Sequence, residues 1–137
     1  MRDWLTQPRY GEFAGELAAR ERIARYYDQR LGNAVKIPAR VPGAKSAWAI
    51  YAILLASPGE RNRVQGALNA SGVPTAIYYP KPLHHQPAYR DHHDGAALPV
   101  SEDLAGRILA LPIHPDLSEA AQARVCDALL AAVGVRT

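Results

Sequence analysis

The sequence is poor in cysteine and has no long apolar run. A single cysteine, Cys126, stands among 137 residues, so no disulfide can form within the chain. Because secreted domains of small size often depend on disulfides, this composition favours a reducing compartment. The longest apolar run, residues 47–56, is about half as long as a membrane-spanning helix. The polar start, "MRDWLTQPRY", lacks the apolar centre of a secretion signal. We therefore expect a cytoplasmic protein with no membrane partner.

Positive charge is present but is not concentrated in one place. The formal net charge is +3, and the cations alternate with acids in stretches such as "ELAARERIARYYDQR". A surface that binds nucleic acid gathers its cations and leaves few acids among them. The pattern indicates a solvated helix surface instead, and we expect no nucleic-acid partner.

Four helices are predicted within one domain that spans residues 1–137. The first covers residues 10–31, with apolar side chains at three-and-four spacing and Gly32 as its stop. The members of this stripe are Phe13, Leu17, Ala24, Tyr27 and Leu31. The second follows the capping sequence "SPGE" at Ser57 and ends at Gly72.

The third and fourth predicted helices begin at serines. Ser101, with two acids after it, suits the start of a helix, and Ser118 can cap the last helix, which ends before Gly134. The buried positions predicted for the last three helices are Val64, Leu68, Leu104, Ile108, Val125, Leu129 and Val133.

Strands are predicted between the helices. Residues 34–41 suit an edge strand because Pro38 forbids a central position. Residues 47–56 indicate a strand buried on both faces, and residues 73–79 and 109–114 supply two more. The fold class is therefore α/β (α+β), with a small three- to four-stranded sheet, mixed or antiparallel, packed with helices.

The segment "YYPKPLHHQPAYRDHHDG", residues 78–95, holds four of the chain's five histidines and no regular period. Its prolines predict a stiff loop. Four side chains on that loop suit a polar, ring-shaped ligand, since they combine flat apolar faces with hydrogen-bonding groups. They are Tyr78, Tyr79, His84 and Gln86. The residues leave open the alternative that one tyrosine packs in the core and the loop is merely rigid.

Metal binding and nucleophilic catalysis are not predicted. The loop histidines occur as the adjacent pairs His84–His85 and His92–His93, and neighbouring side chains on a strand point to opposite faces. No cysteine cluster accompanies them, so we expect no metal site, although a metal-binding histidine loop remains a rival interpretation. Cys126 lies in "ARVCDALL", where burial is expected, and no catalytic residue is predicted.

Three stretches resemble one protein family. They are "SAWAIYAI", "VQGALNASGVPTAIYYPKPLHHQPAY" and "LPVSEDLAGRILALPIHPDLSEAAQARVCDAL". They are similar to the C-terminal part of the DegT/DnrJ/EryC1/StrS family of pyridoxal-phosphate-dependent sugar aminotransferases. The resemblance runs from about Phe13 to Leu130. It implies the small C-terminal domain of the aspartate-aminotransferase fold type, whose large domain carries the cofactor.

The resemblance also implies a function. The full-length enzyme would move an amino group, from glutamate, to a keto-sugar nucleotide, with Tyr78, Tyr79, His84 and Gln86 as substrate contacts. None of the three lysines, Lys36, Lys45 and Lys81, matches the family's cofactor-binding lysine segment. We therefore expect the large domain to be absent, no cofactor bound to this chain, and no activity from it alone.

One further expectation concerns assembly. The apolar stripe of residues 10–31 and the proline-rich loop would lack the neighbours that they have in the family, so we expect a homo-oligomer. The alternative to a domain of an aminotransferase is an inactive stand-alone binding or interaction module left by truncation.

Overall fold

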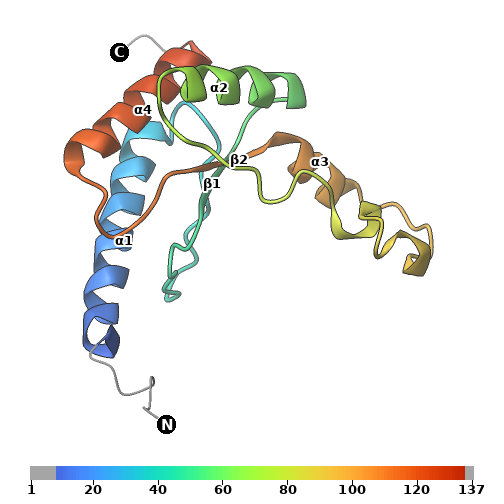
Figure 1. The fold of residues 1–137 in the computed structure, drawn as a ribbon, viewed down its shortest axis with the longest axis horizontal. Coiled ribbons are helices and arrows are strands. Elements are labelled where there is room, and N and C mark those ends of the chain that lie inside the picture. The colour runs from blue at the N-terminus through green and yellow to red at the C-terminus, as the bar shows by residue number, and fades with distance from the viewer. Residues whose placement is uncertain (1–8, 135–137) are drawn as a thin grey trace.

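The computed structural model describes residues 9–134; residues 1–8, most of the polar start, and residues 135–137 lie outside the described part. Within it, helices alternate with short strands (Figure 1). The helices are α1 (Arg9–Leu31), α2 (Pro58–Ala70), α3 (Pro99–Arg107) and α4 (Glu119–Val133). The strands are β1 (Tyr51–Leu54) and β2 (Ile108–Leu111), and two 3-10 turns lie between α2 and α3, η2 (Leu83–His85) and η3 (Arg90–His92).

Helices α2 and α4 begin at the capping residues that the sequence predicts. The hydroxyl group of Ser57 accepts a 3.1 Å hydrogen bond from the backbone N–H of Glu60, and Ser118 does the same for Ala121 at 3.2 Å. These bonds satisfy backbone donors that have no partner inside the helix. After α4, Gly134 adopts a left-handed conformation with φ of 83°, as expected of a glycine that ends a helix.

The sheet is small and antiparallel. Strand β1 pairs with β2, so that Tyr51 lies opposite Leu111 and Leu54 lies opposite Ile108. Single bridges extend it on both sides, from Lys36 to Leu54 and from Ala76 to Ala110. The fold class is therefore as predicted, and all four predicted strand segments take part. Two of them contribute one bridge each, because nearby prolines such as Pro38 remove the N–H groups that a longer ladder needs.

The strand predicted over residues 47–56 is shorter and less buried than expected. It forms only at Tyr51–Leu54, and Ile50 before it is exposed. Within the strand Tyr51 and Ile53 are buried, whereas Ala52 and Leu54 are half-buried. Burial on both faces was therefore the wrong interpretation. Alternate side chains enter the core, as in a sheet that is covered mainly on one face.

The core lies where α1, α2 and α4 meet the sheet (Figure 1). Its largest fully buried side chains are Tyr27, Leu31, Tyr51, Ile53, Leu55, Val64, Leu68, Leu109, Cys126 and Leu129. The predicted inner positions of α2 and α4 are confirmed, with Val133 half-buried. Arg30 of α1 holds Asp127 of α4 at 2.6 Å, and Arg124 of α4 donates to the carbonyl oxygen of Ser71 at 2.6 Å.

The apolar stripe of α1 is buried only in its second half. Ala24, Tyr27 and Leu31 are buried as predicted, but Phe13 is 54% exposed and Leu17 is half-buried. The first turns of α1 extend beyond the other elements of the described chain (Figure 1). Helical spacing identified the apolar face correctly, but no described element reaches its start.

Helix α3 departs most from expectation. It begins at Pro99 rather than Ser101, and Leu104, predicted to be buried, is 37% exposed, while Ile108 is half-buried. The helix and the loop before it project as an arm from the sheet, away from α1 (Figure 1). The apolar side of α3 therefore faces that loop instead of the core.

The C-terminal end of the arm is fixed to the rest of the protein. Arg107 Nη1 donates a 3.1 Å hydrogen bond to the carbonyl oxygen of Leu55, next to β1. At Gly106, α3 approaches the start of α2 so closely that a Cβ atom would lie 3.2 Å from Cγ of Pro58. None of the helices in residues 9–134 is both long enough and apolar enough to cross a bilayer.

Candidate functional site

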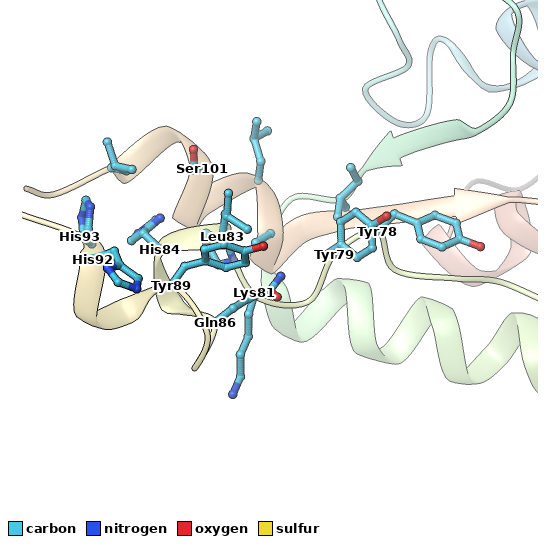
Figure 2. Close-up of a pocket in the computed structure, with 15 residues that line it drawn as sticks. Tyr78, Tyr79, Lys81, Leu83, His84, Gln86, Tyr89, His92, His93 and Ser101 are labelled. Atoms are coloured by element: carbon cyan, nitrogen blue, oxygen red, sulfur yellow. The ribbon is translucent and has the colours of Figure 1, made fainter.

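The loop of residues 78–95, here called the ring-rich loop, and α3 enclose an open hollow of about 970 Å³ on the arm (Figure 2). All four residues singled out from the sequence line it. The lining consists of Tyr78, Tyr79, Lys81, Pro82, Leu83, His84, Gln86, Tyr89, His92, His93, Leu98, Ser101, Leu104, Ala105 and Ile108. The structure therefore brings the predicted side chains together with the exposed side of α3.

The two tyrosines stand at the sheet end of the hollow. They lie two and three residues after the bridge at Ala76, and their ring centroids are 5.8 Å apart. Tyr78 is 46% exposed and Tyr79 is 67% exposed, so neither ring is packed in the core. That excludes the alternative in which one of them is a core residue. Both phenols are free to offer a flat face and a hydroxyl group to a ligand.

The opposite end of the hollow is stiffened by successive tight turns. The backbone N–H of His85 donates to the carbonyl oxygen of Pro82, and that of Gln86 donates to Leu83, each at 3.0 Å. The N–H of Tyr89 then donates to the carbonyl oxygen of Gln86 at 3.0 Å. The half-buried Gln86 side chain is thus held on a defined backbone, as the prolines of the sequence predicted.

The His84 side chain is largely enclosed, with 8% of it exposed. Its Nε2 atom lies 3.2 Å from Oε1 of Glu102 on α3. Its ring centroid lies 4.2 Å from that of His85 and 4.9 Å from that of His93. The hydrogen bond from His84 is the main cause that lowers the pKa of Glu102, helped by a hydrogen bond from the backbone N–H of Leu98.

The geometry contradicts the argument that adjacent histidines diverge. His84 and His85 both turn toward Glu102, at 3.2 Å and 3.9 Å between Nε2 and Oε1. The three donor atoms lie within 4.8 Å of one another. The reason is that these histidines form a 3-10 turn, in which neighbours are about 120° apart, rather than a strand, where they are opposed. Glu102 was missed because it lies 18 residues beyond His84 in the sequence.

The lining of the hollow suits a polar ligand that is neutral or anionic. Phenols, imidazoles and a carboxamide offer donors and acceptors, and Lys81 adds a positive charge. Among the described lining residues there is no carboxylate. Cys126 is fully buried in the core, and burial raises the pKa of its thiol to about 11, so it takes no part.

The residues of the hollow do not fit pyridoxal phosphate by themselves. That cofactor needs a lysine amine, an acid beside its pyridine nitrogen and a set of donors around its phosphate. Lys81 could offer an amine, but the described lining holds no acid, and Lys36 lies elsewhere, at the edge of the sheet. We therefore derive no chemical step through the cofactor from this chain.

Comparison with known proteins places the chain in a family. A model of the DegT/DnrJ/EryC1/StrS aminotransferase family matches residues 9–130. The chain belongs to this family. The family match covers the ring-rich loop, α3 and both strands, and it confirms the resemblance drawn from the sequence motifs.

Individual relatives agree. An aminotransferase from Pseudomonas aeruginosa, UDP-2-acetamido-2-deoxy-3-oxo-D-glucuronate aminotransferase, is 37% identical over 123 residues, which are 89% of this chain and 33% of the relative. The crystal structure of a DegT DnrJ EryC1 StrS aminotransferase from Brucella abortus superposes with a TM-score of 0.80 at 45% identity, covering 87% of this chain and 31% of that one.

A third relative is known with a reaction intermediate bound. The crystal structure of DesV from S. venezuelae, in complex with a ketimine intermediate, superposes with a TM-score of 0.86 at 26% identity, over 94% of this chain and 34% of that one. The chain thus spans about a third of the length of the relatives that it matches.

Proposed function

We propose that the chain is the C-terminal domain of a pyridoxal-phosphate-dependent aminotransferase that acts on a keto-sugar nucleotide, with glutamate as the amino donor. Family membership supports this proposal, and so do the names of the relatives. The Pseudomonas aeruginosa relative is named for a UDP-linked oxo sugar, and another, from Streptomyces venezuelae, is named for a dTDP-linked amino sugar. This chain would correspond to the last third of the full-length enzyme. The cofactor would be held by the other two thirds.

We propose that the hollow on the arm contributes to the sugar-nucleotide side of the active site. The observation that carries this proposal is the convergence of Tyr78, Tyr79, His84 and Gln86 on one open hollow. A sugar nucleotide offers a flat base, sugar rings with many hydroxyl groups, and two phosphates. Exposed phenols suit the rings, imidazole and carboxamide groups suit the hydroxyls, and Lys81 suits a phosphate charge.

The test is to titrate UDP-N-acetylglucosamine and dTDP-glucose into the isotopically labelled chain and to follow its amide resonances. We expect weak binding, since only one part of the proposed active site is present, with shifts concentrated in residues 78–86. Tyr79→Ala should lower the apparent affinity derived from these shifts at least tenfold. Val41→Ala, at an exposed apolar site elsewhere, should leave the affinity unchanged. Shifts spread over other surfaces, or none, would favour a stand-alone interaction module.

The chain alone should neither bind pyridoxal phosphate as an aldimine nor transfer an amino group. Its residues supply no acid beside an amine in the hollow. Absorbance spectra with added cofactor test this expectation. An aldimine band that disappears in Lys81→Ala, together with turnover of glutamate, would contradict it.

We also propose that the protein works in the cytoplasm as a homo-oligomer, without nucleic-acid or membrane partners. A free and fully buried cysteine is compatible with a reducing compartment. Exposed apolar side chains on α1 and on the arm, such as Phe13 and Tyr79, support association with another copy.

A further inference from the structure

Two adjacent histidines and a glutamate from a separate helix meet on the arm. One of them, His84, also lines the hollow. His84 and His85 belong to η2, and Glu102 belongs to the first turn of α3. Each offers one ligand atom, and these three atoms lie within 4.8 Å of one another. Imidazole nitrogen and carboxylate oxygen are the donors that zinc binds in sites with three protein ligands.

The spacing of the donors suits a small divalent ion. In a tetrahedral site with bonds of about 2.0–2.2 Å, neighbouring donors lie about 3.3–3.6 Å apart. Nε2 of His84 is 3.2 Å from Oε1 of Glu102, and Nε2 of His85 is 3.9 Å from the same oxygen. The His85 side chain is 53% exposed, so it has room to rotate toward a closer approach.

Hydrogen bonding accounts for only part of this arrangement. Oε1 of Glu102 already faces two donors, His84 at 3.2 Å and the backbone N–H of Leu98 at 3.4 Å. His85 lies too far away, at 3.9 Å, to form a third hydrogen bond. At that distance a protonated His85 forms an ion pair with Glu102, and the same approach also places its nitrogen to share a metal ion with that oxygen.

The surroundings hold the His84 ring in place. The His84 ring is 8% exposed and lies against the His85 and His93 rings, with centroids 4.2 Å and 4.9 Å away. Nε2 of His93 in turn lies 2.8 Å from the carbonyl oxygen of Ala96. Such second-layer contacts orient a ligating imidazole before the ion arrives.

We propose that His84, His85 and Glu102 bind one zinc ion, with the fourth position left to solvent. The imidazole and carboxylate set selects zinc or a similar transition metal over magnesium or calcium, which prefer oxygen ligands alone. The ion would fasten the ring-rich loop to α3. This site shares His84 with the hollow, but it does not depend on the proposed aminotransferase function.

The experiment is a calorimetric titration of zinc chloride into the tag-free 137-residue chain after treatment with a chelator. We expect one zinc ion per chain with a dissociation constant at or below about 1 µM. His85→Ala and Glu102→Gln should each weaken binding at least about tenfold. Neither change should alter the circular dichroism spectrum, since both side chains are exposed. Cobalt should give the intense visible absorption of a tetrahedral site, and Glu102→Gln should abolish it.

His92→Ala is the matched control, because His92 lies in the same loop but outside the three ligands. It should leave the zinc affinity unchanged. A dissociation constant above about 1 µM, more than one ion per chain, or an equal loss in His92→Ala would overturn the proposal, because exposed imidazoles would then account for the binding. His85 does not line the hollow, so His85→Ala should leave the response to sugar nucleotides intact. The two proposals can thus fail separately.

Discussion

The hydroxyl group of Tyr27 donates a 2.8 Å hydrogen bond to the carbonyl oxygen of Pro112, 85 residues further along the chain. Tyr27 is fully buried, and its ring meets Tyr51 edge-on, with centroids 5.1 Å apart. Burial, with smaller effects from Cys126 and Tyr26, raises the pKa of Tyr27, so its hydroxyl stays a donor at every physiological pH. One side chain thus joins α1, β1 and the end of β2.

Tyr27→Phe should destabilise the protein by about 1–3 kcal/mol. The change keeps the ring and its apolar contacts but leaves the buried side of the Pro112 carbonyl without its donor. Urea unfolding followed by circular dichroism measures the loss. Tyr26→Phe is the control, since within residues 9–134 the hydroxyl of Tyr26 accepts a hydrogen bond from the exposed Arg30 alone. It should cost less than about 0.5 kcal/mol. Equal losses in the two variants would contradict the role assigned to Tyr27.

The thiol of Cys126 should be unreactive until the protein unfolds. It is fully buried, and burial is the main reason that its pKa rises to about 11. A disulfide reagent at pH 8 should label no thiol in the native chain. In guanidinium chloride it should label one thiol per chain. Ala131→Cys, at an exposed position of the same helix, should add one equivalent that reacts at once. Rapid native labelling of the unmodified chain would show that α4 opens readily.

Local signals in the sequence predicted the helices better than the strands. Ser57, Ser118 and Gly134 act within a few residues of themselves, so their bonds can be recognised without knowing the rest of the fold. The extent of a strand depends instead on its partners. Residues 73–79 have the composition of a strand, yet only Ala76 finds a partner, in β2.

Helical spacing carries a similar limit. It identified the apolar faces that hold Phe13 and Leu104, but it could not tell whether any element packs on them, and both side chains are exposed. The candidate site shows the same division. Tyr78, Tyr79, His84 and Gln86 were found because one segment carries them, whereas Glu102 comes from a separate helix and meets His84 only in the folded chain.

A buried tryptophan makes stability depend on pH through Glu21. Partial burial alone would raise the pKa of Glu21, but the 2.6 Å hydrogen bond from Trp48 and the charges of Arg40 and Arg25 outweigh it and lower the pKa below 4.5. A carboxyl whose pKa is lower in the folded state stabilises the protein above its unfolded pKa. That contribution disappears as the pH falls through the folded pKa.

Glu21→Gln should therefore cost about 1 kcal/mol at neutral pH, and the difference from the unmodified chain should shrink as the pH falls below about 4.5. Urea unfolding at several pH values measures it. Asp116→Asn removes an exposed carboxylate outside this cluster, and its effect should stay near zero throughout. A difference for Glu21→Gln that grows as the pH falls would reverse the sign and refute the assignment.

The first turns of α1 should form a contact between two copies of the chain. Phe13 is 54% exposed and Leu17 is half-buried on the same apolar face, and on the arm Tyr79 is 67% exposed. Apolar side chains left open to this extent lower their free energy by meeting another surface, and a symmetric dimer is the simplest way for a single chain to supply one.

Light scattering at several concentrations should report twice the chain mass. Phe13→Glu should raise the dissociation constant at least about tenfold, because it places a charge in an apolar contact. Val41→Glu, at a 67% exposed apolar residue outside α1 and loop 78–89, should leave the mass unchanged. A monomer at every concentration would mean that solvent is tolerated on this face, and an equal effect of both substitutions would mean that net charge, rather than α1, governs association.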